Sequence, residues 1–181
     1  MTAGHTAGAS SATRCSNWQT INWSIAKAHV LRLQMRIAKA EREGRQGKVK
    51  SLQRLLTTSF YGRCLAVKRV TSSTGSKTPG IDGVILSTQN QKMDCVSSLK
   101  RRGYTTSPLR RIYIPKKSGK MRSLSIPTIN DRAMQALWHA ALVPIAEERA
   151  DPNAYGFRPK RSTHDAIEQC FNALAKRDSA Q

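Results

Sequence analysis

The spacing of apolar residues predicts helices in the first third of the chain. Across residues 18–37 large apolar side chains recur at three- and four-residue steps, and a second stripe of this kind runs across residues 49–70. Such spacing is typical of amphipathic helices. Gly44 and Gly47 separate the two stripes. We therefore expect two helices joined by a short glycine-bearing link, which favours an antiparallel helix pair.

A different period appears in the middle of the chain. In residues 109–114 and 121–126 apolar and polar side chains alternate, and Ser118-Gly119 lies between them. Alternation on both sides of a glycine turn predicts a β-hairpin, because glycine adopts positive φ without steric cost. Proline cannot donate to a strand ladder, so Pro115 and Pro127 should mark strand ends.

Three further segments have the pattern of helices, which makes the expected fold class α+β with one small antiparallel sheet. Residues 89–102 carry apolar side chains at helical spacing and are followed by Gly103. Thr128 and Ser162 each precede an aspartate by three residues, which predicts helix N-termini. Pro144 should end or kink the helix that Thr128 opens.

Charge narrows the class of partner. The 181 residues carry 31 Lys and Arg against 11 Asp and Glu, a net charge of +20. A polyanion offsets such self-repulsion, and nucleic acid is the usual one. An anionic membrane is the rival partner, but no stretch approaches the ~20 apolar residues of a spanning helix. We therefore expect a nucleic-acid partner and no membrane.

Two basic regions are candidates for RNA binding. The helical pair contains only Glu41 and Glu43 as acids, so ion pairing within the helices cannot account for most of its cations. No acid lies between Cys95 and Asn130. A charged solvent-facing surface is the alternative for both regions. The candidate residues are Arg32, Arg36, Lys39, Arg45, Lys48, Lys100, Arg101, Arg102, Arg110, Arg111, Lys117 and Lys120.

The cysteines, the histidines and the first residues do not show the pattern of a metal site or a secretory signal. The four cysteines and four histidines are scattered without a C-x-x-C pair, which favours reduced thiols and no metal site. Residues 1–15 are small and polar, so we expect a disordered tail and no secretory signal. A cytoplasmic location fits these features.

Four motifs in order resemble those of bacterial group II intron reverse transcriptases and maturases. They are TPGIDG at residues 78–83, IPKK at 114–117 with RSLSIP at 122–127, YGFRP at 155–159, and STHDA at 162–166. The first helical stripe also resembles the N-terminal extension of that family. The resemblance covers roughly residues 16–178.

The resemblance implies the fingers region of a right-hand polymerase that copies RNA. In the family, a hairpin lysine and the following arginine lie over the triphosphate of the incoming nucleotide, and these positions match Lys116 and Arg122. Without the family, both would be generic phosphate contacts. The full-length family enzyme is expected to use Mg²⁺. The catalytic strand and the Tyr-x-Asp-Asp turn of the family have no match here, so we expect no catalytic residue, no metal site, no bound cofactor and no polymerisation by this chain.

These expectations define a domain organisation and three functional hypotheses. After the tail, residues 16–73 would form a basic helical domain and residues 74–181 a partial fingers domain. The chain would be the N-terminal piece of an RNA-directed DNA polymerase, a stand-alone RNA-binding module with a maturase-like role, or an inactive remnant. Its partners would be intron or template RNA and a palm and thumb supplied elsewhere. The apolar stripe of the last helix, which includes Phe171 and Leu174, should then be exposed.

Overall fold

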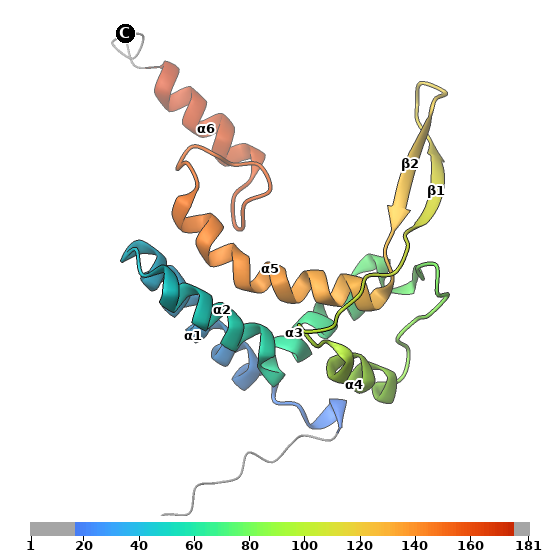
Figure 1. Ribbon diagram of the computed structural model, residues 1–181. Coiled ribbons are helices and arrows are strands. Elements are labelled where there is room, and N and C mark those ends of the chain that lie inside the picture. The colour runs from blue at the N-terminus through green and yellow to red at the C-terminus, as the bar shows by residue number, and fades with distance from the viewer. Residues whose placement is uncertain (1–16, 176–181) are drawn as a thin grey trace, which may run out of the picture.

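The computed structural model describes residues 17–175, and the predicted tail at residues 1–15 lies outside them. Within this range the fold is α+β, as expected: a body of packed helices carries one two-stranded antiparallel sheet that projects from it (Figure 1). The elements in order are η1 (Trp18–Thr20), α1 (Trp23–Arg42), α2 (Gln46–Thr58), α3 (Phe60–Thr71), η2 (Thr74–Lys77), α4 (Gln89–Ser98), β1 (Arg110–Pro115), β2 (Met121–Ile126), α5 (Ile129–Arg149) and α6 (Thr163–Leu174).

The core lies where α1, α2, α3 and α5 pack against one another. Ile37 of α1, Leu56 of α2, Val67 of α3 and Leu137 of α5 are all almost fully buried in it. Burying one such side chain stabilises the fold by about 1.5–3 kcal/mol. The two apolar stripes predicted from the sequence are therefore the inner faces of the N-terminal helices.

The second stripe is two helices, not the single helix that its spacing predicted. Ser59 has extended backbone angles (φ −69°, ψ 142°), and its Oγ accepts a hydrogen bond from the Gly62 amide at 3.0 Å. Serine competes in this way for backbone groups and favours helix starts. The apolar periodicity continues across the break, so a stripe alone could not reveal it. A Cβ on Gly62 would lie 2.5 Å from the Leu56 carbonyl oxygen, so only glycine fits this close junction.

Two predicted boundaries were wrong. Gly44 ends α1 with a φ of +68°, but Gly47 lies inside α2 and does not separate the helices. The helix predicted over residues 89–102 ends at Ser98. Leu99 leaves helical geometry (ψ 73°) while its side chain stays buried in the core, and the exposed residues that follow it form a turn.

The strands and the glycine turn of the predicted hairpin are confirmed. The pairs run from Arg110 with Ile126 to Pro115 with Met121, and Gly119 in the turn has a φ of +75°. Its sides are largely exposed, because only Ile126 at its base is buried. The hairpin therefore projects from the helical body rather than covering it (Figure 1).

The sequence predicted that Pro144 ends or kinks α5, and of these two outcomes the end is excluded, because the helix passes through Pro144 and continues to Arg149. Proline cannot donate to the carbonyl four residues earlier, which is that of Ala140. The side-chain amide of Gln34 in α1 donates to this carbonyl oxygen at 2.8 Å. That contact satisfies the buried acceptor and lets the helix continue, and Figure 1 shows α5 bending toward its C-terminal end.

Candidate nucleic-acid interface

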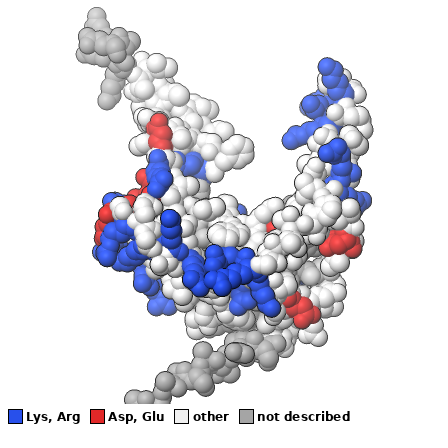
Figure 2. Space-filling model, viewed as in Figure 1, with Lys and Arg blue, Asp and Glu red and all other residues white. Residues whose placement is uncertain are grey.

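One face of the molecule is hollowed. The hairpin rises on one side and α6 on the other, and α5 runs between them along the floor (Figure 1). We call this concave face the hollow. Figure 2 shows Lys and Arg side chains along the hairpin, on the opposite side below α6, and in a broad patch at the foot of the hollow. The floor between them is largely free of charge.

The hairpin gathers six of the predicted cations. Arg110 and Arg111 lie on β1, Lys116, Lys117 and Lys120 around the turn, and Arg122 on β2. The Lys116 amide donates to the Lys120 carbonyl oxygen at 2.8 Å and closes the turn. Pro115 pairs with Met121 and Ile114 pairs with Arg122, so Lys116 and Arg122 lie diagonally across the hairpin, on either side of its last pair and near the turn. Among the described residues none of the six forms an ion pair.

The helical candidates are less uniform. Arg32 and Arg36 are exposed on α1. Lys39 and Arg45, by contrast, both contact the Glu43 carboxylate, at 3.9 and 3.4 Å. Such exposed ion pairs contribute little to stability, but they place one negative charge beside two of the cations. Lys48 lies on α2 and joins no ion pair in the described part of the chain.

Lys100, Arg101 and Arg102 meet two cations that the site prediction missed. They follow α4 and line a pocket of about 300 Å³ together with Arg54 of α2 and Arg63 of α3. We call it the junction pocket. The sequence did show Arg54 and Arg63 as part of a basic helical face, but nothing in their spacing linked them to a turn about forty residues later.

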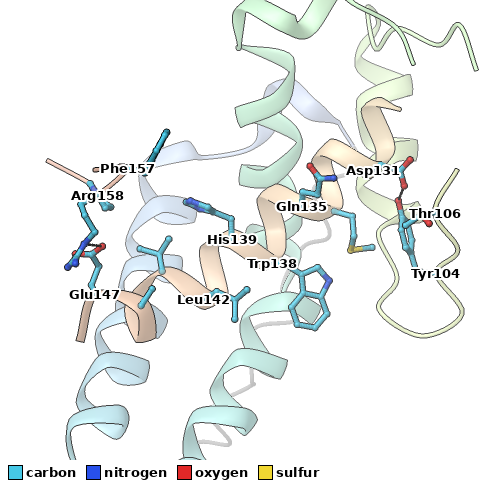
Figure 3. Close-up of a pocket in the computed structure, with 14 residues that line it drawn as sticks. Tyr104, Thr106, Asp131, Gln135, Trp138, His139, Leu142, Glu147, Phe157 and Arg158 are labelled. Atoms are coloured by element: carbon cyan, nitrogen blue, oxygen red, sulfur yellow. Dashed lines mark hydrogen bonds and ion pairs between the residues drawn. The ribbon is translucent and has the colours of Figure 1, made fainter. Parts of the chain in front are cut away.

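An apolar groove of about 660 Å³ follows the exposed side of α5 (Figure 3). Trp138 and Leu142 form its middle and are 37% and 51% exposed. At one end, Figure 3 shows the Tyr104 hydroxyl directed at the Asp131 carboxylate, to which it donates at 2.5 Å. Burial raises the pKa of Asp131, but hydrogen bonds from Tyr104 and from Thr128 outweigh burial and leave this pKa below its ordinary value.

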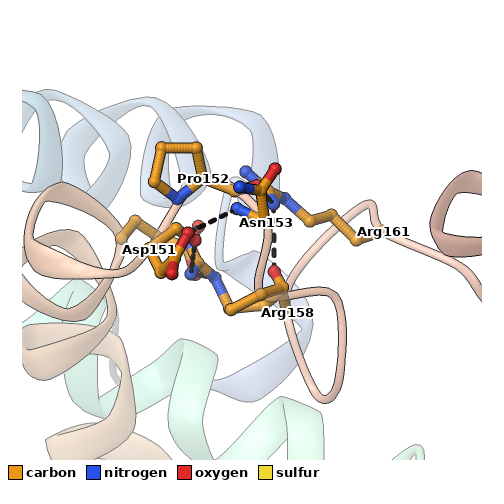
Figure 4. A network of polar contacts seen from close by, with 7 residues as sticks. Asp151, Pro152, Asn153, Arg158 and Arg161 are labelled. Atoms are coloured by element: carbon orange, nitrogen blue, oxygen red, sulfur yellow. Dashed lines mark hydrogen bonds and ion pairs between the residues drawn. The ribbon is translucent and has the colours of Figure 1, made fainter. Parts of the chain in front are cut away.

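The loop between α5 and α6 bounds the other end of the groove. Arg158 donates to both Glu147 oxygens, at 2.8 and 2.7 Å, and this hydrogen-bonded pair lowers the pKa of Glu147. Arg161 donates to the carbonyl oxygens of Pro152 and Ala154 (Figure 4). These contacts hold the loop from within, so both arginines have structural partners.

Phe157 shows what the loop presents to solvent. Its φ of 59° is left-handed, which is uncommon for a residue with a side chain. Its ring is fully exposed and lines the end of the groove. The ring therefore takes no part in the core and is accessible for a contact at this end of the groove.

The carboxylates of the described residues do not fit the Mg²⁺ site of a polymerase. Asp131 and Asp165 accept hydrogen bonds at the starts of α5 and α6, as the sequence predicted, and Glu147 is held by Arg158. Within residues 17–175 no three His, Cys, Asp or Glu gather where they could hold a metal ion. Two-metal phosphoryl transfer needs carboxylates that converge on ions about 4 Å apart. The carboxylates of Asp131, Asp165 and Glu147 are therefore structural groups of the helix starts and of the loop after α5.

Sequence comparisons identify the family. The model for the N-terminal domain of reverse transcriptase matches residues 18–99, and the model for reverse transcriptase (RNA-dependent DNA polymerase) matches residues 114–181. The group II intron-encoded protein LtrA of Lactococcus lactis is 37% identical over 107 residues, covering 58% of this chain and 18% of LtrA. The chain belongs to the group II intron-encoded reverse transcriptase and maturase family.

Two other relatives extend the match within this family. Protein YkfC of Escherichia coli K12 is 40% identical over 123 residues, which are 64% of this chain and 32% of YkfC. Maturase-like protein 1 of Euglena longa is 24% identical over 159 residues, which are 86% of this chain and 35% of that protein. The chain thus spans about a third or less of the length of these relatives.

The two family models divide the elements between them. Helices α1 to α4 lie within residues 18–99, the match to the reverse transcriptase N-terminal domain. The distal part of the hairpin, α5 and α6 lie within the match to the polymerase. The division at residues 73 and 74 stays a prediction. Among the described helices none is long and apolar enough to cross a bilayer.

Proposed function

We propose that this chain binds RNA and the triphosphate of an incoming nucleotide as the fingers part of a group II intron-type reverse transcriptase. The observation that supports this most is the hairpin, where six cations meet no acid. Two cations beside each other on a rigid hairpin can offset triphosphate charge and orient the nucleotide. In this proposal Lys116 and Arg122 hold the triphosphate, and the other basic residues of the hairpin and helices hold RNA.

Salt dependence tests RNA binding. Each phosphate contact releases counterions, so log K should fall linearly with log salt, by about 0.7 per contact for a single strand. We expect a steep slope for an intron-derived or template RNA, measured by fluorescence anisotropy. An affinity that does not change between low and physiological salt would contradict the proposal.

The same preparation tests the chemistry. With template-primer, Mg²⁺ and deoxynucleotides, we expect no extension above background, because the carboxylates described above have other structural roles. Nucleotide binding would still be visible as quenching or crosslinking of a triphosphate analogue, and K116Q with R122Q should weaken it. Primer extension by material free of host polymerases would contradict this part of the proposal.

The partner of the apolar surface is proposed to be the palm and thumb of the polymerase. Ile167, Phe171 and Leu174 on α6 are 66%, 69% and 81% exposed, and the loop that precedes α6 lines one end of the apolar groove of α5. Exposed apolar surface of this kind supports a protein contact. Among the described residues Cys95 and Cys170 are free thiols, which fits a reducing cytoplasm as the proposed location.

A maturase-like role is the second candidate, because maturase-like relatives match most of this chain. Such a role would need RNA binding but neither nucleotide nor palm. Folded intron RNA would then compete with template-primer for the same cations. Binding of intron RNA that is unaffected by K116Q and R122Q, together with no nucleotide binding, would favour this candidate.

A further inference from the structure

The junction pocket is built where the helical region meets the segment after α4. Its cations come from three places in the chain: Arg54 from α2, Arg63 from α3, and Lys100, Arg101 and Arg102 from the turn. Leu99 and Thr57 also line it, and both are about 2% exposed. The cations of the pocket therefore lie above buried, well-packed residues.

No described acid pairs with the cations of the junction pocket. No acid lines the pocket, and none of its five cations forms an ion pair among the described residues. The hydroxyls of Thr57 and Thr58 donate to carbonyl oxygens of their own helix. The donors that remain for a ligand are therefore cationic, and the ligand they fit is an anion.

Arg63 adds a second observation. Its Nη1 donates to the Val96 carbonyl oxygen at 3.3 Å, while its buried Nε has no hydrogen-bond partner among the described residues. A guanidinium has five N–H donors, so most of those on Arg63 are unused by the protein. Buried donors are normally paired, and an unpaired one costs about 1–3 kcal/mol. Arg63 is thus fixed by one hydrogen bond and keeps donors that are available to a ligand.

We propose that the junction pocket binds a backbone phosphate of the RNA strand. This inference rests on the proposed function and specifies where one RNA contact is made. No aromatic side chain lines the pocket, so it offers no surface on which a base could stack. It therefore recognises the phosphate and not the base. The broad patch at the foot of the hollow in Figure 2 lies in this region, on the same face as the hairpin cations.

The pocket also joins two parts of the chain. A phosphate that neutralises Arg54 and Arg63 together with Lys100 and Arg101 removes repulsion between α2, α3 and the turn after α4. Binding should therefore stabilise the fold, because a ligand that binds only the folded state raises its stability. Exposed cations elsewhere on the surface could also bind RNA, but a small anion bound to them would not stabilise the fold in this way.

The experiment compares two triple variants of the full 181-residue chain that lose the same charge. The pocket variant is R54Q, R101Q and R102Q. The control is K27Q, K50Q and K77Q, which changes three exposed lysines that do not line the pocket. Each protein is melted with and without inorganic pyrophosphate at matched ionic strength, and each is titrated with a single-stranded RNA.

We expect pyrophosphate to raise the melting temperature of the unchanged chain and of the control by several degrees, and that of the pocket variant by less than about one degree. At physiological salt the pocket variant should bind RNA about tenfold more weakly, and the control less than about threefold. R63K, which keeps the charge but loses the guanidinium geometry, should also reduce the pyrophosphate effect. If the triple variant does not fold, R101Q with R102Q in the exposed turn replaces it.

The outcomes separate this inference from the proposed function. If the unchanged chain binds no RNA, the proposed function fails, whatever pyrophosphate does. If RNA binds but both triple variants lose affinity equally, the junction pocket is not a site and the inference is overturned. If pyrophosphate stabilises through the pocket while RNA affinity is unchanged there, the pocket binds free phosphates and the assignment to RNA is overturned.

Discussion

The hairpin and α6 are both arms that leave the same helical body, yet their surfaces are opposites. The hairpin carries six cations and no acid, whereas the exposed stripe of α6 is apolar. Neither arm is buried against the core. Exposure therefore does not by itself tell what an arm is for. The chemistry that it exposes does: cations without acids favour a polyanion, and an apolar stripe favours a protein surface.

The two arms also differ in what holds them. The hairpin is fixed by its own strand ladder and by Ile126, which is buried at its base. Helix α6 begins with a complete capping box between Ser162 and Asp165, but none of its side chains is buried. Local hydrogen bonds thus form the helix, and packing does not hold it. A short helix that lacks packing is marginal in water, so α6 has most to gain from a partner.

The largest expected effect concerns the body that carries both arms. Leu137 of α5 is 2% exposed and packs in the core, so L137A should lower the free energy of unfolding by about 2–5 kcal/mol. Urea unfolding followed by far-ultraviolet circular dichroism measures the change. The matched substitution in the arm, L174A, should change stability by less than about 0.5 kcal/mol. Equal losses would mean that α6 is packed as firmly as the core.

The next largest effect concerns the cationic arm. Replacing Arg110, Arg111, Lys117 and Lys120, the hairpin cations assigned to RNA, by glutamine should weaken RNA binding on the order of a hundredfold at physiological salt and lower the salt slope by about 3. Fluorescence anisotropy over a range of salt concentrations measures both. Thermal stability should stay unchanged, because within residues 17–175 these side chains have no ion-pair partners to lose. An unchanged slope would place the RNA away from the hairpin.

Sequence periodicity predicted the arms better than it predicted the body. The hairpin depends on contacts between neighbours in the chain, so alternation and Gly119 were enough to define it. The exposed stripe of α6 was also predicted correctly. The break at Ser59 was not predicted, and at Pro144 the sequence could not decide between an end and a kink, because each depends on distant or unusual partners. The amide of Gln34, more than one hundred residues away, satisfies the carbonyl that Pro144 leaves free.

The candidate site divides in the same way. The run of cations without acids gave the hairpin residues, because charge can be counted along the chain. The junction pocket could not be predicted, because Arg54 and Arg63 approach Lys100 only through the packing of α2, α3 and α4. The sequence also could not show that Lys39 and Arg45 both form ion pairs with Glu43. Counting charges finds a basic region, but only folding shows which cations are paired.

A smaller effect is expected where the floor of the hollow meets the base of the hairpin arm. Y104F removes the hydrogen bond from the Tyr104 hydroxyl to Asp131 and should cost about 1 kcal/mol, because its acceptor is a carboxylate at a helix start. This bond helps to keep the pKa of Asp131 below its ordinary value of about 3.9. The folded state therefore gains stability above pH 4 and loses it as the pH falls through the lowered pKa.

The Y104F variant should lose less of its free energy of unfolding as the pH falls, because the Tyr104 hydroxyl no longer stabilises the charged form of Asp131. Unfolding at a series of pH values between 2 and 7 checks this. The control is Y113F on the hairpin, whose side chain is 60% exposed and forms no hydrogen bond among the described residues. If Y104F and Y113F have the same acid profile, the bond to Asp131 does not contribute to pH-dependent stability.

The smallest effect on stability is expected at the apolar arm. This effect shows whether α6 has an exposed face that a partner could cover. Phe171 and Leu174 are 69% and 81% exposed, so F171S with L174S leaves no cavity and should change the free energy of unfolding by less than about 0.5 kcal/mol. The exposed apolar surface shrinks, so the double variant should be more soluble and less self-associated in sedimentation velocity runs. N172S with E168S, on the same helix, is the matched control and should leave association unchanged. Unfolding caused by the double variant would show that α6 already belongs to a complete core in solution, and the contrast between the two arms would then fail.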